Sequence, residues 1–240
     1  MNPLILIPAR MAATRLPNKP LADIGGKPMI VRAWEQAALS GFRVAVAAGD
    51  PEIVEVVEAA GGLAVLTDPA LPSGSDRIRA AVEAVDPDAA HDIVINIQGD
   101  MPFASPDLAR ACADLLARES ACDIATLVAA EADASDRANP DVVKAVLALP
   151  EGETSGRALY FTRSTLYGDG PVWRHVGIYG YRREALMRFC AAPPSPLEKR
   201  EKLEQLRALE MDLQIWASVI DEAPLSVDNP SDLEAARALA

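Results

Sequence analysis

The sequence contains few cysteines and histidines, and this scarcity limits the sites that it can form. Its 240 residues include three cysteines and two histidines. The cysteines at 112, 122 and 190 include no Cys-x-x-Cys pair and are odd in number, so we expect buried thiols rather than a disulfide framework or a zinc site. Because only His91 and His175 are present, histidine-rich metal sites and most histidine-based triads are excluded. We expect His91 to be solvated in a polar loop.

Several short motifs with well-defined chemistry are also absent. The sequence has no Gly-x-x-x-x-Gly-Lys-Ser/Thr loop, no Gly-x-Gly-x-x-Gly fingerprint, no Gly-x-Ser-x-Gly elbow and no His-Glu-x-x-His helix. These motifs build P-loop, dinucleotide, serine-hydrolase and zinc sites, respectively. The sequence therefore predicts none of these four kinds of site.

Positive charge and long apolar runs are scarce as well. Lys and Arg number 23 against 35 Asp and Glu, which gives a formal net charge of −12. This balance disfavours a general nucleic-acid partner, because phosphate backbones require a positive surface. No apolar run approaches the roughly 18 residues of a membrane span, and the run over 4–7 is too short for a signal peptide. We therefore expect a cytoplasmic protein with no membrane partner.

Half of the residues are hydrophobic, and strand patterns alternate with helix patterns along the chain. This alternation predicts one α/β domain over 1–240, with a three-layer α/β/α arrangement and a mainly parallel sheet. A small antiparallel excursion is expected over about 155–182. The expected strands and extended segments are 3–7, 43–47, 63–66, 92–97, 123–128, 142–147, 157–161, 174–182 and 213–220. The expected helices are 28–39, 50–61, 75–85, 105–117 (capped by Ser105), 196–209 and 231–239 (capped by Ser231).

The loop after the first strand carries three cations, Arg10, Arg15 and Lys19. Ligands of open α/β sheets bind beyond the carboxyl ends of strands, where this loop begins. Arginine donates paired hydrogen bonds to phosphate, and lysine supplies a mobile point charge. A solvated basic loop is the alternative interpretation. Three clustered cations in an acidic chain favour a cradle for a polyphosphate.

Two aspartates are candidate metal ligands. Asp100 ends the run Asn96-Ile97-Gln98-Gly99-Asp100 after a buried strand, and Asp228 precedes the last expected helix. Carboxylate oxygens are ligands that Mg²⁺ takes together with water and substrate phosphate. The alternative for each aspartate is an ordinary turn or helix cap.

An extended segment near the end of the excursion combines polar and small residues. Strand alternation over 175–181 places His175, Gly177 and Tyr179 on one face. The glycines leave room for a polar ligand against the backbone, whereas the alternative is plain packing.

Sequence blocks spanning almost the whole chain resemble, in order, the 3-deoxy-manno-octulosonate (Kdo) cytidylyltransferases, also called CMP-Kdo synthetases. The opening loop resembles the wider nucleotidyltransferase superfamily. The His-x-Gly-x-Tyr and Glu-Gln-Leu-Arg blocks are similar to the Kdo branch. The blocks are 7–10, 15–21, 25–30, 73–77, 96–100, 139–140, 143–144, 158–163, 175–181, 203–207 and 227–230.

The resemblance implies a Rossmann-like nucleotidyltransferase sheet and an enzyme that joins CTP and Kdo into CMP-Kdo and pyrophosphate, for lipopolysaccharide synthesis. It implies Mg²⁺ on Asp100 and Asp228, and a cytoplasmic homodimer. The nucleotide-binding residues that it implies are Pro8, Ala9, Arg10, Arg15, Lys19, Ser75, Arg77 and Gln98. Among these, the residues expected to act on the triphosphate during catalysis are Arg10, Arg15 and Lys19. The sugar-binding residues that it implies are His175, Tyr179, Glu204 and Gln205.

The sequence departs from the family pattern at a few positions. Ala13 stands where the family usually has Ser, Asn18 where it has Gly, and Met101 where Glu is common. These departures leave other acceptors open: 8-amino-Kdo, sialic acid or a polyol phosphate. A non-catalytic nucleotide-binding protein with the same fold is the alternative from another functional class.

Overall fold

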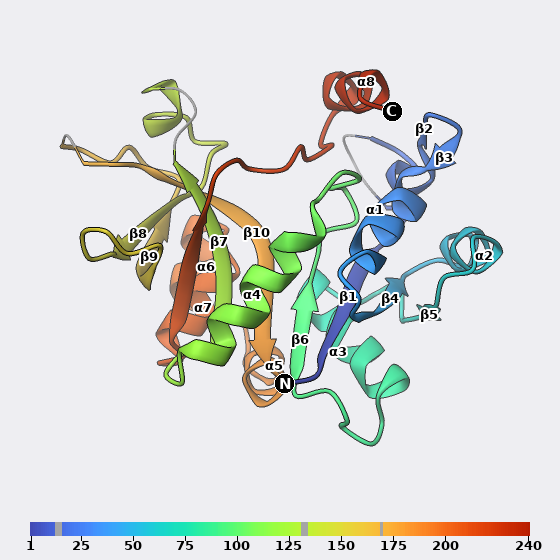
Figure 1. The fold of residues 1–240 in the computed structure, drawn as a ribbon, viewed down its shortest axis with the longest axis horizontal. Helices are drawn as coiled ribbons and strands as arrows, with labels where there is room; N and C mark the ends of the chain where they lie inside the picture. The colour runs from blue at the N-terminus through green and yellow to red at the C-terminus, as the bar shows by residue number, and fades with distance from the viewer. Residues whose placement is uncertain (13–15, 131–133, 169) are drawn as a thin grey trace. The chain divides into compact units, whose positions relative to one another are not determined.

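The computed structural model describes residues 1–12, 16–130, 134–168 and 170–240 (Figure 1). The chain forms two compact units, which we call unit 1 (Met1–Arg110 with Pro224–Ala240) and unit 2 (Ala111–Ala223). Each unit combines strands with helices, as expected for the α/β class. That residues 1–240 form a single nucleotidyltransferase domain stays a prediction.

The sheet of unit 1 consists of four parallel strands in the order β5-β4-β1-β6. They are β1 (Pro3–Ala9), β4 (Arg43–Ala48), β5 (Ala64–Leu66) and β6 (Ile93–Asn96). The run of Leu and Ile over 4–7 is completely buried, which is typical of a parallel strand covered on both faces. The four strands predicted here are confirmed, with ends shifted by one or two residues.

Three helices connect these strands: α1 (Met29–Ala38), α2 (Pro51–Ala59) and α3 (Gly74–Val85). Helices α1 and α2 pack against each other and against the strands. The connection from β5 to β6 runs through α3 and crosses back past β4 and β1. Because such crossovers are right-handed, α3 covers the face of the sheet opposite to α1 and α2. The strand order therefore reverses between β1 and β6, which is where doubly wound sheets bind their ligands.

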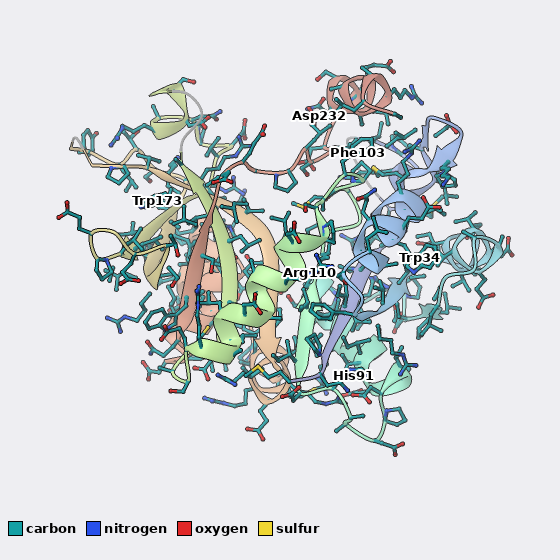
Figure 2. The ribbon with its side chains drawn as sticks, in the orientation of Figure 1. Trp34, His91, Phe103, Arg110, Trp173 and Asp232 are labelled. Atoms are coloured by element: carbon teal, nitrogen blue, oxygen red, sulfur yellow. The ribbon has the colours of Figure 1, made fainter. Side chains whose placement is uncertain are left out.

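A small hairpin that sequence analysis did not anticipate follows the loop after β1. Its strands are β2 (Asp23–Ile24) and β3 (Lys27–Pro28), and Gly25 and Gly26 have φ angles of 57° and 80°. Positive φ at both turn residues is the requirement of a tight hairpin turn, which glycine meets without strain. Helix α8 (Pro230–Ala238) closes a hydrophobic cluster with this hairpin, and Phe103 packs at its side (Figure 2). The cluster consists of Ile24, Met29, Val227, Leu233 and Ala236.

The cap of α8 differs from the predicted one. The Asn229 side chain accepts a hydrogen bond from the Asp232 N–H at 3.0 Å, and the Asp232 carboxylate accepts from the Asn229 N–H at 3.1 Å. Ser231 is therefore not the cap: Pro230 fits the first helical position, where no N–H is needed, and the cap moves one residue back. In contrast, the cap predicted for α4 (Pro106–Arg118) is confirmed, because the Ser105 hydroxyl accepts from the Asp107 N–H at 3.3 Å.

The sheet of unit 2 is mixed and follows the order β10-β7-β11-β9-β8. Its strands are β7 (Ile124–Ala130), β8 (Lys144–Ala148), β9 (Ser155–Thr162), β10 (Trp173–Arg182) and β11 (Ile215–Ile220). Among the described strands of this unit, β7 and β11 pair in parallel, β10 pairs antiparallel with both β7 and β8, and β9 pairs antiparallel with β11 and β8. The antiparallel excursion is therefore confirmed, and it begins at β8, earlier than the expected start near 155.

The helices of unit 2 include two departures from the prediction. Helix α5 (Arg183–Ala191) was not anticipated, although its buried residues recur at helical spacing. The single helix expected over 196–209 is wrong: the structure has α6 (Pro196–Glu201) and α7 (Gln205–Glu210). Lys202 ends α6 in the left-handed conformation, with φ 56°, and this geometry breaks the helix. Two short 3-10 turns, η1 (Lys19–Leu21) and η2 (Ala134–Arg137), complete the elements.

Gly156 in β9 tests the packing of the mixed sheet. A Cβ atom on Gly156 would overlap the backbone carbonyl oxygen of Ala148 and lie 3.0 Å from Leu149 Cα. Because backbone cannot yield as a flexible side chain can, we expect Gly156→Ala to lower the free energy of unfolding by about 1–3 kcal/mol. Thermal denaturation measures this effect. Gly170→Ala is the matched control, since a Cβ there meets nothing within 4 Å; equal melting temperatures for the two variants would contradict the prediction.

Candidate active site

A cavity of about 350 Å³ opens in unit 1 at the carboxyl ends of β1 and β6. A smaller cavity of about 130 Å³ shares part of its wall. The first is lined by Pro8, Ala9, Arg10, Ala12, Lys19, Pro20, Met29, Gln98, Gly99 and Asp100. The second is lined by Pro8, Ala9, Arg10, Leu71, Ser73, Gly74, Arg77 and Gln98. Seven of the eight nucleotide-binding residues expected from the sequence fall within the described part of the chain, and six of those seven line these cavities.

Gly99 allows the loop after β6 to lie close to the end of β1. A Cβ atom at this position would lie 3.1 Å from the Pro8 carbonyl oxygen and 3.1 Å from Ile30 Cδ1. Only glycine avoids both close contacts, so the loop after β6 can lie directly against the end of β1. This close approach places Gln98 and Asp100 on the same cavity as Arg10.

Lys19 lies between the two predicted metal ligands. Its Nζ donates to Asp100 Oδ2 at 2.7 Å and to Asp228 Oδ1 at 3.3 Å. The side chains of Lys19, Asp100 and Asp228 are 15%, 24% and 44% exposed, so the group is partly shielded from solvent. Asn18 starts the η1 turn in the left-handed conformation, with φ 57°, which asparagine tolerates better than most residues. The structure thus brings both carboxylates within reach of one cation.

Backbone and cap contacts hold Asp228 in this place. The Val227 N–H donates to the Asp100 carbonyl oxygen at 2.9 Å, which ties the two loops together. The Asp228 N–H donates to Asp232 Oδ2 at 2.8 Å (Figure 2 labels Asp232). Because Asn229 caps α8, the interpretation of Asp228 as an ordinary helix cap is wrong.

Two arginines face the smaller cavity. Arg10 is exposed, whereas Arg77 is 2% exposed and donates to Thr67 Oγ1 at 2.6 Å and to the Asp68 carbonyl oxygen at 3.2 Å. Burial and the charge of Arg10 lower the pKa of Arg77. A Cβ on Gly49 would lie 2.8 Å from the Arg77 guanidinium, so glycine leaves room for it. Two neighbouring guanidinium groups favour an anionic ligand.

The two other expected nucleotide-binding residues are Arg15 and Ser75. Arg15 lies outside the described residues. Ser75 is buried in α3 and does not line either cavity, whereas Ser73 and Gly74 at the start of the same helix line the smaller one. The signal that could have identified Ser73 is its position as helix cap: its hydroxyl accepts from the Asp76 N–H at 3.1 Å. Helix N-termini attract anions, so this end of α3 suits a phosphate.

Three of the four expected sugar-binding residues of unit 2 line one small cavity. They are Tyr179, Glu204 and Gln205, and the cavity measures about 10 Å³. That volume holds about one water molecule. The fourth residue, His175, packs its ring 5.5 Å from that of Tyr179 and 4.9 Å from that of Phe161. The structure therefore gathers all four residues in unit 2.

His175 and Tyr179 lie on the same side of β10, as predicted, although the strand is irregular between them. The register of β10 against β7 shifts between Val176 and Tyr179. The shift adds two residues to β10, and two is the period of strand alternation, so the facing of the side chains is preserved. Burial lowers the pKa of His175 to about 4, and burial followed by the charge of Glu204 raises the pKa of Tyr179. Both side chains are uncharged at neutral pH.

The depressed pKa of His175 predicts a dependence of stability on pH. An unfolded chain takes up a proton near pH 6.5, whereas the folded chain does so near pH 4, so acid favours unfolding between these values. We expect the melting temperature of the wild type to fall more steeply from pH 6.5 to pH 4 than that of His175→Gln. Thermal denaturation over this range measures the two slopes, and parallel slopes would contradict the assignment.

Whether His91 and the three cysteines are buried was also predicted from the sequence. His91 is 7% exposed and its Nδ1 lies 3.1 Å from the Asn2 carbonyl oxygen, so the expected solvated position is wrong (Figure 2). Cys112 and Cys122 are free and buried, as expected, whereas Cys190 is free but only partly buried, so the expectation of a buried thiol is wrong there. Within the described ranges, no group of three or more His, Cys, Asp or Glu side chains has the geometry to hold a metal ion. No helix of those ranges is long and apolar enough to cross a membrane.

A parallel sheet with a cation-lined cavity at its switch point is typical of nucleotide-binding α/β enzymes. In agreement, residues 4–215 match the family described as cytidylyltransferase. The chain is 57% identical over 239 residues to a 3-deoxy-manno-octulosonate cytidylyltransferase of Parvibaculum lavamentivorans, covering 99% of this chain and 92% of that protein. It is 55% identical over 240 residues to the enzyme of that name from Rhodospirillum centenum, with coverages of 99% and 93%.

Comparison with solved structures supports the same family. A CMP:2-keto-3-deoxy-manno-octonic acid synthetase complexed with CTP is similar to this chain with a TM-score of 0.91 and 36% identity. The similarity covers 100% of this chain and 98% of that one. The chain belongs to the 3-deoxy-manno-octulosonate cytidylyltransferase family.

Proposed function

We propose that the chain transfers the CMP group of CTP to Kdo, giving CMP-Kdo and pyrophosphate for lipopolysaccharide biosynthesis. Family membership supports the reaction, since the relatives carry this enzyme's name and a similar synthetase was solved with CTP. The observation that carries the proposal is the convergence of Asp100 and Asp228 on Lys19 beside the switch-point cavity. A nucleotide-binding protein without catalysis has less need of a paired carboxylate site.

The nucleotide is assigned to the two cavities of unit 1. Arg10, Arg15 and Lys19 hold the triphosphate, and the backbone at Pro8 and Ala9 lies beside it. Arg77 is already anchored to the protein through Thr67 and Asp68, so its charge is preorganised for an anion and costs little to orient. The family resemblance assigns Gln98 and Arg77 to the junction of nucleotide and sugar, and both residues line the smaller cavity.

Asp100 and Asp228 fit a Mg²⁺ ion. They are hard oxygen ligands from separate loops, and two carboxylates plus substrate phosphate and water are a usual Mg²⁺ environment. In the structure an ammonium group satisfies both carboxylates, which indicates that this place favours positive charge. A bound Mg²⁺ supplies charge neutralisation for phosphate oxygens there. With the carboxylates holding an ion, the Lys19 ammonium would be available to the triphosphate.

In the proposed reaction, the anomeric oxygen of Kdo forms a bond to the α-phosphorus of CTP. The bond between the α- and β-phosphates breaks, pyrophosphate leaves, and the hydroxyl proton passes to solvent. The protein contributes position and charge, which supply most of the rate enhancement in phosphoryl-type transfer. No side chain is assigned as a general base.

The acceptor is assigned to His175, Tyr179, Glu204 and Gln205 in unit 2. Neutral His175 and Tyr179 suit the hydroxyl groups of a sugar, because each offers hydrogen bonds without a charge to desolvate. Glu204 is held 3.4 Å from the Arg207 guanidinium, which limits the repulsion between its carboxylate and an acidic sugar. The acceptors 8-amino-Kdo, sialic acid and a polyol phosphate remain alternatives for this site.

The experiment measures pyrophosphate release with each nucleoside triphosphate, each acceptor and Mg²⁺. Turnover that requires CTP and Kdo supports the proposal. Turnover with another acceptor but not with Kdo would identify that acceptor as the substrate. CTP binding without turnover on any acceptor would contradict catalysis and favour a non-catalytic nucleotide-binding protein.

The assembly and location are proposed from the family resemblance: a homodimer in the cytoplasm. Sedimentation equilibrium tests the first of these. A mass of two chains supports the homodimer, and a mass of one chain contradicts it.

A further inference from the structure

Thr126, in the middle of β7, joins His175 to the irregular part of β10. Its side chain is completely buried. Its Oγ1 lies 3.0 Å from His175 Nε2, 2.9 Å from the Ile178 carbonyl oxygen and 3.3 Å from the Val176 carbonyl oxygen. One hydroxyl group is therefore surrounded by one imidazole nitrogen and two carbonyl groups from a single strand.

The donors and acceptors of this group determine the tautomer of His175. A hydroxyl has one proton to donate, and carbonyl oxygens only accept. Donation of the Thr126 proton to the nearer carbonyl, that of Ile178 at 2.9 Å, satisfies a backbone group of the irregular stretch. In that arrangement the Thr126 oxygen accepts from His175, whose proton then lies on Nε2. Since the ring is neutral, Nδ1 carries no proton and is left as a hydrogen-bond acceptor.

The register shift explains why a hydroxyl is needed at this position. Between Val176 and Tyr179, β10 has two more residues than β7, so the regular ladder is interrupted there. Thr126 bonds a carbonyl of the irregular stretch with its proton and the histidine with its oxygen. Side-chain hydroxyls commonly satisfy backbone groups that a bulge leaves out of the ladder.

We propose that Thr126 is a positioning residue, which fixes the orientation and tautomer of His175 so that Nδ1 accepts a hydrogen bond from a hydroxyl of the acceptor sugar. The tautomer rests on the contacts of Thr126 and on the neutral ring of His175. The role toward the sugar rests on the proposed function. Ring packing against Phe161 and Tyr179 restricts the imidazole further, but neither ring selects a tautomer.

The first test is spectroscopic and needs no substrate. The chain has two histidines, so the ¹⁵N ring resonances of His175 are assigned as those lost in His175→Gln. In the wild type we expect a protonated Nε2 and an unprotonated Nδ1 above the pKa of the ring. Thr126→Ser keeps the hydroxyl and should keep this pattern, whereas Thr126→Val should give a mixture of tautomers. A protonated Nδ1 in the wild type overturns the inference even if Thr126→Val does not fold.

The second test is kinetic. Thr126→Val should raise the KM for Kdo about tenfold, equivalent to about 1.4 kcal/mol, while the KM for CTP changes by less than about twofold. Thr126→Ser should restore the KM for Kdo. Equal changes in both KM values, or no rescue by serine, would contradict positioning. A wild type with no turnover on Kdo defeats the proposed function, and the tautomer measurement still decides the inference about Thr126.

Discussion

Asp100→Asn is expected to lower kcat by about a hundredfold or more, because one charged group lost from a transition-state site costs about 3 kcal/mol. Asparagine has nearly the same shape but carries no charge. Asp100 accepts from Lys19 at 2.7 Å and lines the main cavity, so the substitution changes the charge there without opening space. Its carbonyl oxygen, which holds Val227, is unaffected.

Pyrophosphate release with CTP, Kdo and Mg²⁺ measures this effect, and thermal denaturation checks that the fold is retained. Asp107→Asn is the matched control. The Asp107 side chain is 77% exposed and pairs with Arg110 on the surface of α4, so its loss should leave kcat unchanged. A near-normal rate for Asp100→Asn would remove Asp100 from the metal site.

Lys19→Met is expected to have the second large effect, with kcat/KM for CTP reduced by about a hundredfold. Methionine keeps much of the side-chain length and removes the charge that we assign to the triphosphate. The structure adds a second consequence. Because Lys19 occupies the two carboxylates, its removal should lower the Mg²⁺ concentration needed for half-maximal rate, since the ammonium no longer competes with the metal.

Steady-state rates at varied CTP and varied Mg²⁺ separate these two effects. Lys27→Met is the control: Lys27 is a half-exposed lysine that pairs with Glu35 at 2.7 Å and is not among the residues that line the two cavities. An increased Mg²⁺ requirement in Lys19→Met would contradict the competition. The double variant Lys19→Met/Asp100→Asn should lose less activity than the sum of the two single losses, because contacting residues do not act independently.

The residues of the proposed active site differ in how far the sequence alone identifies them. Arg10 and Lys19 stand out in the sequence because they belong to a cluster of cations on one loop of an acidic chain, and Asp100 because a carboxylate there follows a buried strand. Arg77 stands out only by resemblance, since its position inside a helix carries no local signal. The structure accounts for it: the guanidinium is buried, anchored by hydrogen bonds and directed to a cavity that the cation loop also lines.

The local elements of the chain follow from its sequence wherever hydrophobic periodicity is strong. The four parallel strands of unit 1 are continuous apolar runs, and a buried strand has few alternatives. Short-range geometry was less predictable. The break at Lys202 and the cap at Asn229 depend on one backbone angle or one proline, and both were missed although each involves a single residue.

What the sequence by itself determined is the order of strands and helices, the family, and most of the residue types at the site, because these depend on local patterns. Only the tertiary structure decided which of those residues meet. Lys19 contacts Asp100 and Asp228 because parallel pairing aligns β1 with β6 and because α8 packs on the Gly25–Gly26 hairpin. Thr126 meets His175 because two strands pair with an irregular register. Such contacts depend on the packing of distant segments, and no short-range pattern encodes them.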